Sequence, residues 1–149
     1  MSLFNTISED LKAAMLARQK DRLESLRAIK TALLLAKTDS AEHDLSEDQE
    51  LKILQKLVKQ RRESADIYKS QNRQDLSDNE LKEAAIIEEY LPKQLSEAEL
   101  IPVLKEIIKR AGASSSKEMG RVMGIASKEL AGKADGRMIA AKVKELLGA

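Results

Sequence analysis

The residues that supply catalysis in most enzymes are scarce in this chain. It contains no cysteine, which removes thiol nucleophiles, thiolate zinc sites and disulfides. Its single histidine, His43, lies in a polar stretch between Glu42 and Asp44. Because a metal site needs three or four converging ligands, we interpret this cluster as a solvated loop. We expect neither a metal site nor a cofactor.

A run of serines beside a lysine, Ser114 to Lys117, is the other arrangement that could hold a nucleophile. A neighbouring base can activate a serine hydroxyl. The same serines, however, precede a helical pattern, where hydroxyls accept hydrogen bonds from the free N–H groups of the first turn. We therefore assign no catalytic residue and do not expect a stand-alone enzyme.

The segment from Lys117 to Lys133 is the most informative part of the sequence. At 100° per residue, one side of a helix here is apolar, with Met119, Val122, Met123, Ala126 and Leu130. The opposite side carries Lys117, Arg121, Gly124 and Lys128. A glycine in mid-helix costs about 0.5–1 kcal/mol against alanine, and one of its uses is the close approach of another backbone. Three interpretations fit the pattern: a solubilising outer surface, a basic surface for an anionic partner, or, through Gly120 and Gly124, close packing of a neighbouring helix.

The type of nucleic acid that such a surface would suit follows from the missing aromatic residues. Single-stranded bases are held by stacking on aromatic side chains, and no aromatic residue follows Tyr90. Structured RNA is recognised through its phosphates and 2′-hydroxyls and needs no such platform. Lys133 and Arg137 come next and could extend the surface. The predicted nucleic-acid-binding residues are Lys117, Arg121, Gly124, Lys128, Lys133 and Arg137.

The composition indicates that helices must position these residues. Aromatic residues make up only 2% of the chain against 42% hydrophobic residues, which favours an aliphatic, all-α core. Five pairs with capping-box spacing mark helix starts: Asp21–Glu24, Ser46–Gln49, Ser77–Glu80, Ser96–Glu99 and Ser115–Glu118. With a first helix at about 2–18, they predict four helices before Pro92 and three after it, at about 96–111, 115–131 and 135–147.

Pro92 marks the expected boundary between an N-terminal helical domain (1–92) and a small three-helix domain (93–149), because the residue before a proline is pushed out of the helical region. The charge changes across it. Residues 1–92 carry 15 Lys and Arg against 18 Asp and Glu, a net charge of −3, whereas residues 93–149 carry 11 against 7, a net charge of +4. The second domain is thus the better candidate for an anionic partner. Pro102 predicts a kink or a delayed start in its first helix.

The motifs of the second domain resemble those of the YqeY proteins of the GatB/YqeY family. They are Leu91-Pro92-Lys93-Gln94-Leu95-Ser96, Gly112-Ala113-Ser114, Lys117-Glu118-Met119-Gly120-Arg121-Val122-Met123-Gly124 and Gly132-Lys133-Ala134-Asp135-Gly136-Arg137. The resemblance covers essentially the whole chain. It implies two helical domains, the second similar to the tail of the B subunit of the glutamine-dependent aspartyl/glutamyl-tRNA amidotransferase. In that enzyme the tail helps to hold the misacylated tRNA.

Three functions remain open at this point. The preferred one is a tRNA-associated binding module with tRNA or a tRNA-handling protein as its partner. The second is a component of a glutamine-dependent carbon–nitrogen ligase, which is how the family is often labelled. The third is a protein–protein adaptor that uses Gly120 and Gly124. The chain shows neither a secretory leader pattern nor an apolar run of about 20 residues, so we expect a cytoplasmic protein with no membrane partner.

Overall fold

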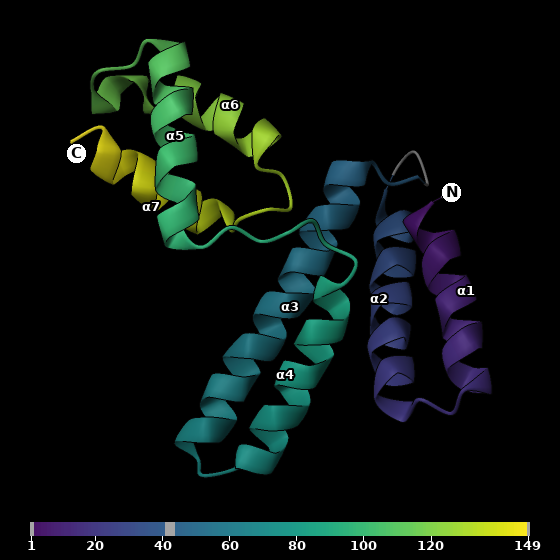
Figure 1. Cartoon of the computed structure of the whole chain (residues 1–149). Helices are drawn as coiled ribbons and strands as arrows, with labels where there is room; N and C mark the ends of the chain where they lie inside the picture. Colours follow the sequence, from purple (N-terminus) through teal and green to yellow (C-terminus); the bar gives the residue numbers. More distant parts are fainter. Residues whose placement is uncertain (1, 41–43, 149) are drawn as a thin grey trace. The chain divides into compact units, whose positions relative to one another are not determined.

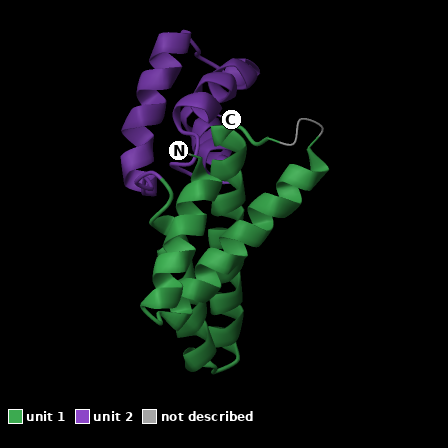
Figure 2. Ribbon diagram, turned by 90° about the vertical axis from the view of Figure 1, so that its right-hand side faces the viewer, with its two compact units in different colours: residues 1–91 green, residues 92–149 purple. Residues whose placement is uncertain are grey.

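The computed structural model describes residues 2–40 and 44–148, and every regular element within these ranges is a helix (Figure 1). The prediction of an all-α fold is confirmed. Glu42 and His43 lie outside the described residues. The chain divides into two compact units, Met1–Leu91 and Pro92–Ala149 (Figure 2). That division lies one residue from the expected domain boundary, and separate folding of the two units stays a prediction.

Unit 1 consists of two helical hairpins. Its helices are α1 (Leu3–Leu16), α2 (Lys20–Asp39), α3 (Glu47–Ser70) and α4 (Gln74–Glu88). The first pair packs together, as does the second, and α2 joins the pairs by packing against α4. The fully buried side chains of its core are aliphatic and include Ile7, Leu26, Ile29, Leu54 and Ile87. Burying such a side chain is worth about 1.5–3 kcal/mol, so a core almost without aromatic residues can hold this unit.

The turns of the two hairpins decide where their second helices begin. Arg18 and Asn72 have left-handed backbones, with φ of 55° and 60°. Because each turn reverses the chain within a few residues, α2 and α4 begin ahead of the caps expected at Asp21 and Ser77. Both residues lie inside their helices, and Ser77 is buried. The two capping boxes expected there are wrong.

Two of the expected capping boxes are confirmed. The Gln49 N–H donates to Ser46 Oγ at 3.2 Å, while the Gln49 side chain accepts from the Ser46 N–H at 2.8 Å. The Glu99 N–H donates to Ser96 Oγ at 3.2 Å, and the Glu99 side chain accepts from the Ser96 N–H at 3.4 Å. In each case the two side chains satisfy N–H groups that have no partner inside the helix.

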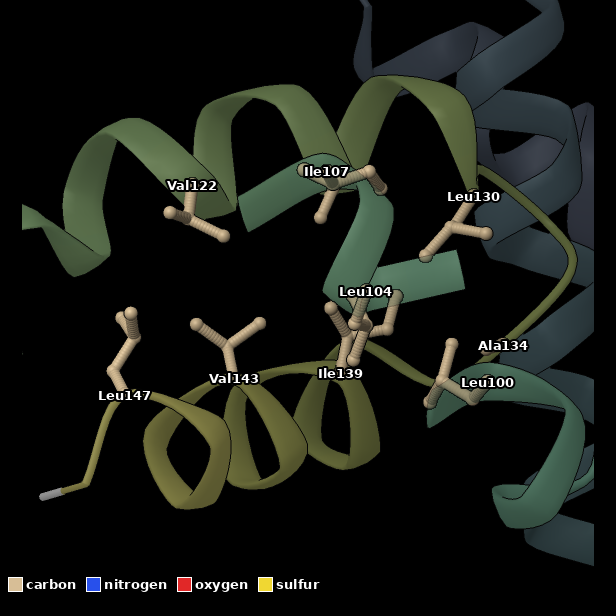
Figure 3. Packing of buried hydrophobic residues seen from close by; sticks show 10 residues of the cluster. Leu100, Leu104, Ile107, Val122, Leu130, Ala134, Ile139, Val143 and Leu147 are labelled. Carbon is tan, nitrogen blue, oxygen red and sulfur yellow. The ribbon is translucent and has the colours of Figure 1, made fainter. Parts of the chain in front are cut away.

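Unit 2 packs three α-helices and one short 3₁₀ turn around a second aliphatic core. Its elements are α5 (Glu97–Ala111), the 3₁₀ turn η1 (Ser116–Glu118), α6 (Met119–Glu129) and α7 (Gly136–Leu146). Figure 3 shows side chains of all three α-helices converging on the centre of the unit. The fully buried ones include Leu100, Leu104, Ile107, Val122 and Val143. The three helices expected after the boundary are therefore present.

Pro102 lies inside α5 without delaying its start. The helix begins at Glu97, and the Leu100 N–H donates to the Ser96 carbonyl at 2.9 Å, so the expectation of a delayed start is wrong. A proline at this position leaves the carbonyl of Ala98 without its usual helical donor. Pro102 and Ala98 are both exposed, so water can take the place of the missing donor.

Candidate nucleic-acid interface

The apolar side of α6 fixes which of its residues face solvent. Val122, Ala126 and Leu130 are buried in the core of unit 2, and Met119 and Met123 pack against it. In Figure 3 the labelled side chains of α6 point toward α7 and α5. The opposite side of the helix is consequently left to solvent, as the apolar pattern predicts.

The basic residues expected on the outer side of this segment are exposed, but they do not share one helix. Arg121, Gly124 and Lys128 lie on the exposed side of α6, and their seven-residue span corresponds to about 10 Å of helix axis. Lys117 is also exposed, yet it belongs to η1. The side chain of Ser115 caps nothing, so the fifth expected capping box is wrong. The angular position that a continuous helix would give Lys117 does not apply.

Ion pairing divides the basic residues into two kinds. Arg121 Nη2 lies 2.7 Å from a carboxylate oxygen of Glu118, three residues earlier. Lys117 and Lys128 form no ion pair with any residue in the described ranges. The charge of Arg121 is thus partly compensated, and those of the two lysines are available to an anion.

Glu129, the carboxylate next to Lys128 in the sequence, is held by another helix. Arg110 of α5 donates to both of its oxygens at 2.7 Å. This hydrogen bonding lowers the pKa of Glu129 and raises the pKa of Arg110. Such a two-point pair is the strongest geometry that Arg and a carboxylate form. The charge of Glu129 is thus compensated by Arg110, and the nearby charge of Lys133 also lowers its pKa.

Lys133 and Arg137 are exposed, but they lie beyond the end of α6. Lys133 is in the turn between α6 and α7, and Arg137 is in the first turn of α7. Figure 3 places Leu130 and Ala134 at the same end of the unit. These two cations therefore follow the end of α6 that carries Lys128. Asp135 caps α7 by accepting from the Arg137 N–H at 3.0 Å, so a carboxylate already holds this helix start.

The glycines of α6 leave its backbone open rather than packed. A Cβ added to Gly120 or to Gly124 would meet no atom within 4 Å. The alternative use of this pair, close packing of a neighbouring helix, is not made within the described chain. Gly124 thus exposes bare backbone between Arg121 and Lys128.

Unit 1 offers a different kind of surface. A cleft of about 320 Å³ lies between α2, α3 and α4, and its polar lining includes four carboxylates, Asp21, Glu24, Glu80 and Glu83, against Lys20 and Lys82. Burial raises the pKa of Glu80, and the charge of Glu83 adds to that effect. An acidic cleft disfavours phosphate, so we place no nucleic-acid site in this cleft.

A polar network in unit 1 had no signal in the sequence. The Tyr90 hydroxyl donates to Asp10 of α1 and accepts from Arg22 of α2, and Arg22 also pairs with Glu89 at 2.7 Å. Burial raises the pKa of Tyr90 to about 12, and the bond to Asp10 adds to the effect. These contacts span about 70 to 80 sequence positions, which local patterns do not reveal. The network ties the end of α4 to both helices of the first hairpin.

Within the described ranges, no helix has the length and apolar character that a membrane span requires. The same ranges bring together no group of three or more acidic, histidine or cysteine side chains suited to a metal ion.

Comparison with known proteins gives one family and several curated relatives. The family model described as Yqey-like protein matches residues 4–147. A protein of Meyerozyma guilliermondii named "Altered inheritance of mitochondria protein 41, mitochondrial" is 40% identical over 87 residues, 58% of this chain and 45% of that protein. The protein of the same name from Pyrenophora tritici-repentis is 26% identical over 153 residues, 96% of this chain and 80% of that protein. The chain spans about half the length of the first of these relatives.

The expectation of a cytoplasmic protein is wrong on this comparison, because the relatives are named as mitochondrial proteins. The relatives' names mention neither tRNA nor an amidotransferase, so those parts of the sequence interpretation stay expectations. The family model matches nearly the whole chain and covers both helical units, so the family assignment is shown directly. The chain belongs to the family of Yqey-like proteins.

Proposed function

We propose that this chain is an RNA-binding module whose unit 2 holds structured RNA, with tRNA as the first candidate, through the phosphates. The observation that carries the proposal is the exposed side of α6. There Arg121 and Lys128 flank the open backbone of Gly124, while the acidic Glu129 is engaged by Arg110. The proposal assigns no chemical step to the chain.

The electrostatics of the unit support this choice. Residues 93–149 carry four more basic than acidic side chains. Lys117 and Lys128 have no ion-pair partner in the described ranges, so binding a phosphate would not first require breaking an ion pair. Arg121 would have to exchange Glu118 for a phosphate, and exposed pairs of this kind are worth only about 0–1 kcal/mol.

A titration of tRNA into the chain at several salt concentrations tests the proposal. Each phosphate contact contributes about −0.9 to the slope of log K against log salt, so three to five contacts predict a slope of about −3 to −5, using the duplex-DNA coefficient. Replacing Lys117, Arg121 and Lys128 together by alanine should make the slope less steep by the amount that about three phosphate contacts contribute. The fold should stay intact, since all three side chains are exposed.

A matched control removes the same amount of charge elsewhere. Lys52, Lys56 and Lys69 are exposed residues of α3 in unit 1, and their joint replacement by alanine also lowers the net charge by three. We expect this variant to bind tRNA nearly as the wild type does. Equal losses in the two triple variants would mean that only net charge matters. Absence of tRNA binding by the wild type at low salt would overturn the proposal in favour of a protein–protein adaptor.

A further inference from the structure

The segment that precedes α5 is fastened to the turn between α6 and α7. Nε2 of Gln94 donates to the carbonyl of Gly132 at 2.5 Å and to the carbonyl of Pro92 at 2.9 Å. Next to it, the Leu95 N–H donates to the carbonyl of Lys133 at 2.9 Å. We call this set of bonds, between residues 92–95 and 132–133, the Gln94 clasp. It joins positions about 38 residues apart.

The turn that the clasp holds depends on this support. Gly132 has a left-handed backbone, with φ of 74°, and it is buried. Its carbonyl accepts from the Gln94 amide, and a buried carbonyl without a donor is unfavourable. Lys133 follows at once, with its carbonyl held by Leu95 and its side chain exposed. The clasp thus fixes the backbone from which one candidate phosphate contact projects.

We infer that Gln94 is a positioning residue for RNA: its carboxamide holds the turn in the conformation that presents Lys133 to a phosphate. This inference rests on the proposed function. The carboxamide suits the task because its NH₂ group offers two donors, and the clasp uses both on backbone carbonyls. A mobile turn would have to be ordered on binding, and that ordering would weaken the contact.

Two substitutions remove the side-chain bonds of the clasp in different ways, and both leave the backbone bond from Leu95 to Lys133 in place. Gln94→Ala removes the whole carboxamide, whereas Gln94→Met keeps a side chain of similar length without an N–H donor. Neither changes the charge, so a loss of tRNA affinity does not come from a change in net charge. We expect both to make the slope of log K against log salt less steep by up to about 0.9, the contribution of one phosphate contact, as we expect for Lys133→Ala. Hydrogen exchange of the Leu95 amide should accelerate in both, while that of the Val122 amide, in the core, should not change.

A double-mutant cycle separates positioning from a general structural effect. If Gln94 acts through Lys133, then Gln94→Met should weaken tRNA binding in the wild type but have almost no effect in the Lys133→Ala background. The matched control is Lys117→Ala, which removes an exposed cation that lies outside the clasp. In that background Gln94→Met should cause the same fold-loss as in the wild type.

The wild-type titration is read first, because absence of tRNA binding there refutes the proposed function and this inference together. If the wild type binds, the inference alone is overturned by either of two results. One is wild-type affinity in both Gln94 variants. The other is an equal fold-loss from Gln94→Met in the Lys133→Ala and Lys117→Ala backgrounds, which would indicate a structural role that does not act through Lys133.

Discussion

Adding one methyl group to two glycines of unit 2 should change its stability in opposite directions. A Cβ at Gly124 or at Gly112 would meet no atom within 4 Å, so neither substitution causes a clash. Both positions are exposed, and they differ in backbone conformation. Gly124 lies within α6, whereas Gly112 ends α5 with a φ of 65°, in the left-handed region. The sign of the change in the stability of unit 2 therefore reports the effect of backbone conformation at each glycine.

The magnitudes follow from that difference. Gly124→Ala should stabilise unit 2 by about 0.5–1 kcal/mol, because alanine loses less entropy than glycine in a helix. Gly112→Ala should destabilise it by about 1 kcal/mol or more, because a Cβ is unfavourable in the left-handed conformation. For a unit of this size, 1 kcal/mol corresponds to a change in Tm of about 4–8 °C.

Thermal unfolding of the full chain, followed by circular dichroism, measures both changes. Tyr68 and Tyr90 both belong to unit 1, so tyrosine fluorescence reports that unit and serves as the internal control. If the two units unfold separately, as the sequence predicts, the fluorescence transition should not move in either variant. Destabilisation by Gly124→Ala, or effects of the same sign in the two variants, would refute the argument. Under the proposed function, Gly124→Ala should also weaken tRNA binding while it raises Tm.

Two further predictions concern the polar contacts that hold helix ends. Ser96→Ala removes the cap of α5 and should lower the free energy of unfolding by about 1 kcal/mol. The side chain of Ser115 caps nothing, so Ser115→Ala should change the free energy of unfolding by no more than about 0.5 kcal/mol. A denaturant titration of both variants measures the two changes. Burial and the Asp10 bond raise the pKa of Tyr90 from 10.0 to about 12, so the folded state favours the protonated phenol. The contribution of the protonated Tyr90 phenol to the free energy of unfolding is complete below about pH 10 and is lost as the pH rises through about 12. The free energy of unfolding of the wild type should therefore fall more steeply over this range than that of Tyr90→Phe. Parallel pH profiles of the two proteins would contradict this prediction.

The capping boxes show where local sequence suffices and where it does not. Residues 44–45 before Ser46 and 92–95 before Ser96 have no regular structure, so the side-chain oxygen decides where the helix begins. Asp21 and Ser77 have the same spacing to an acidic residue, but each follows a tight hairpin turn. The turn itself starts the next helix earlier, at a residue with no side-chain cap. Nothing in the sequence marks Arg18 as a left-handed residue, since arginine is not favoured there.

In the candidate interface, too, some features can be predicted from local sequence and others depend on how the helices pack. The period of the apolar residues in α6 is enough to predict which side is buried, because a helix with one apolar stripe must cover it. The pairing of Glu118 with Arg121 was also readable, since residues three apart on a helix are neighbours. The capture of Glu129 by Arg110 was not, because it depends on how α5 crosses α6.

The sequence by itself determined the all-helical class, the aliphatic cores and the exposed position of the basic residues, because these follow from composition and from a 3.6-residue period. Tertiary structure alone decided that Arg110 pairs with Glu129, that the glycines of α6 remain open, and that Gln94 holds the turn at Gly132. Each of these depends on contacts between residues far apart in the chain. Such contacts form only once the apolar faces have packed, and no local pattern encodes them.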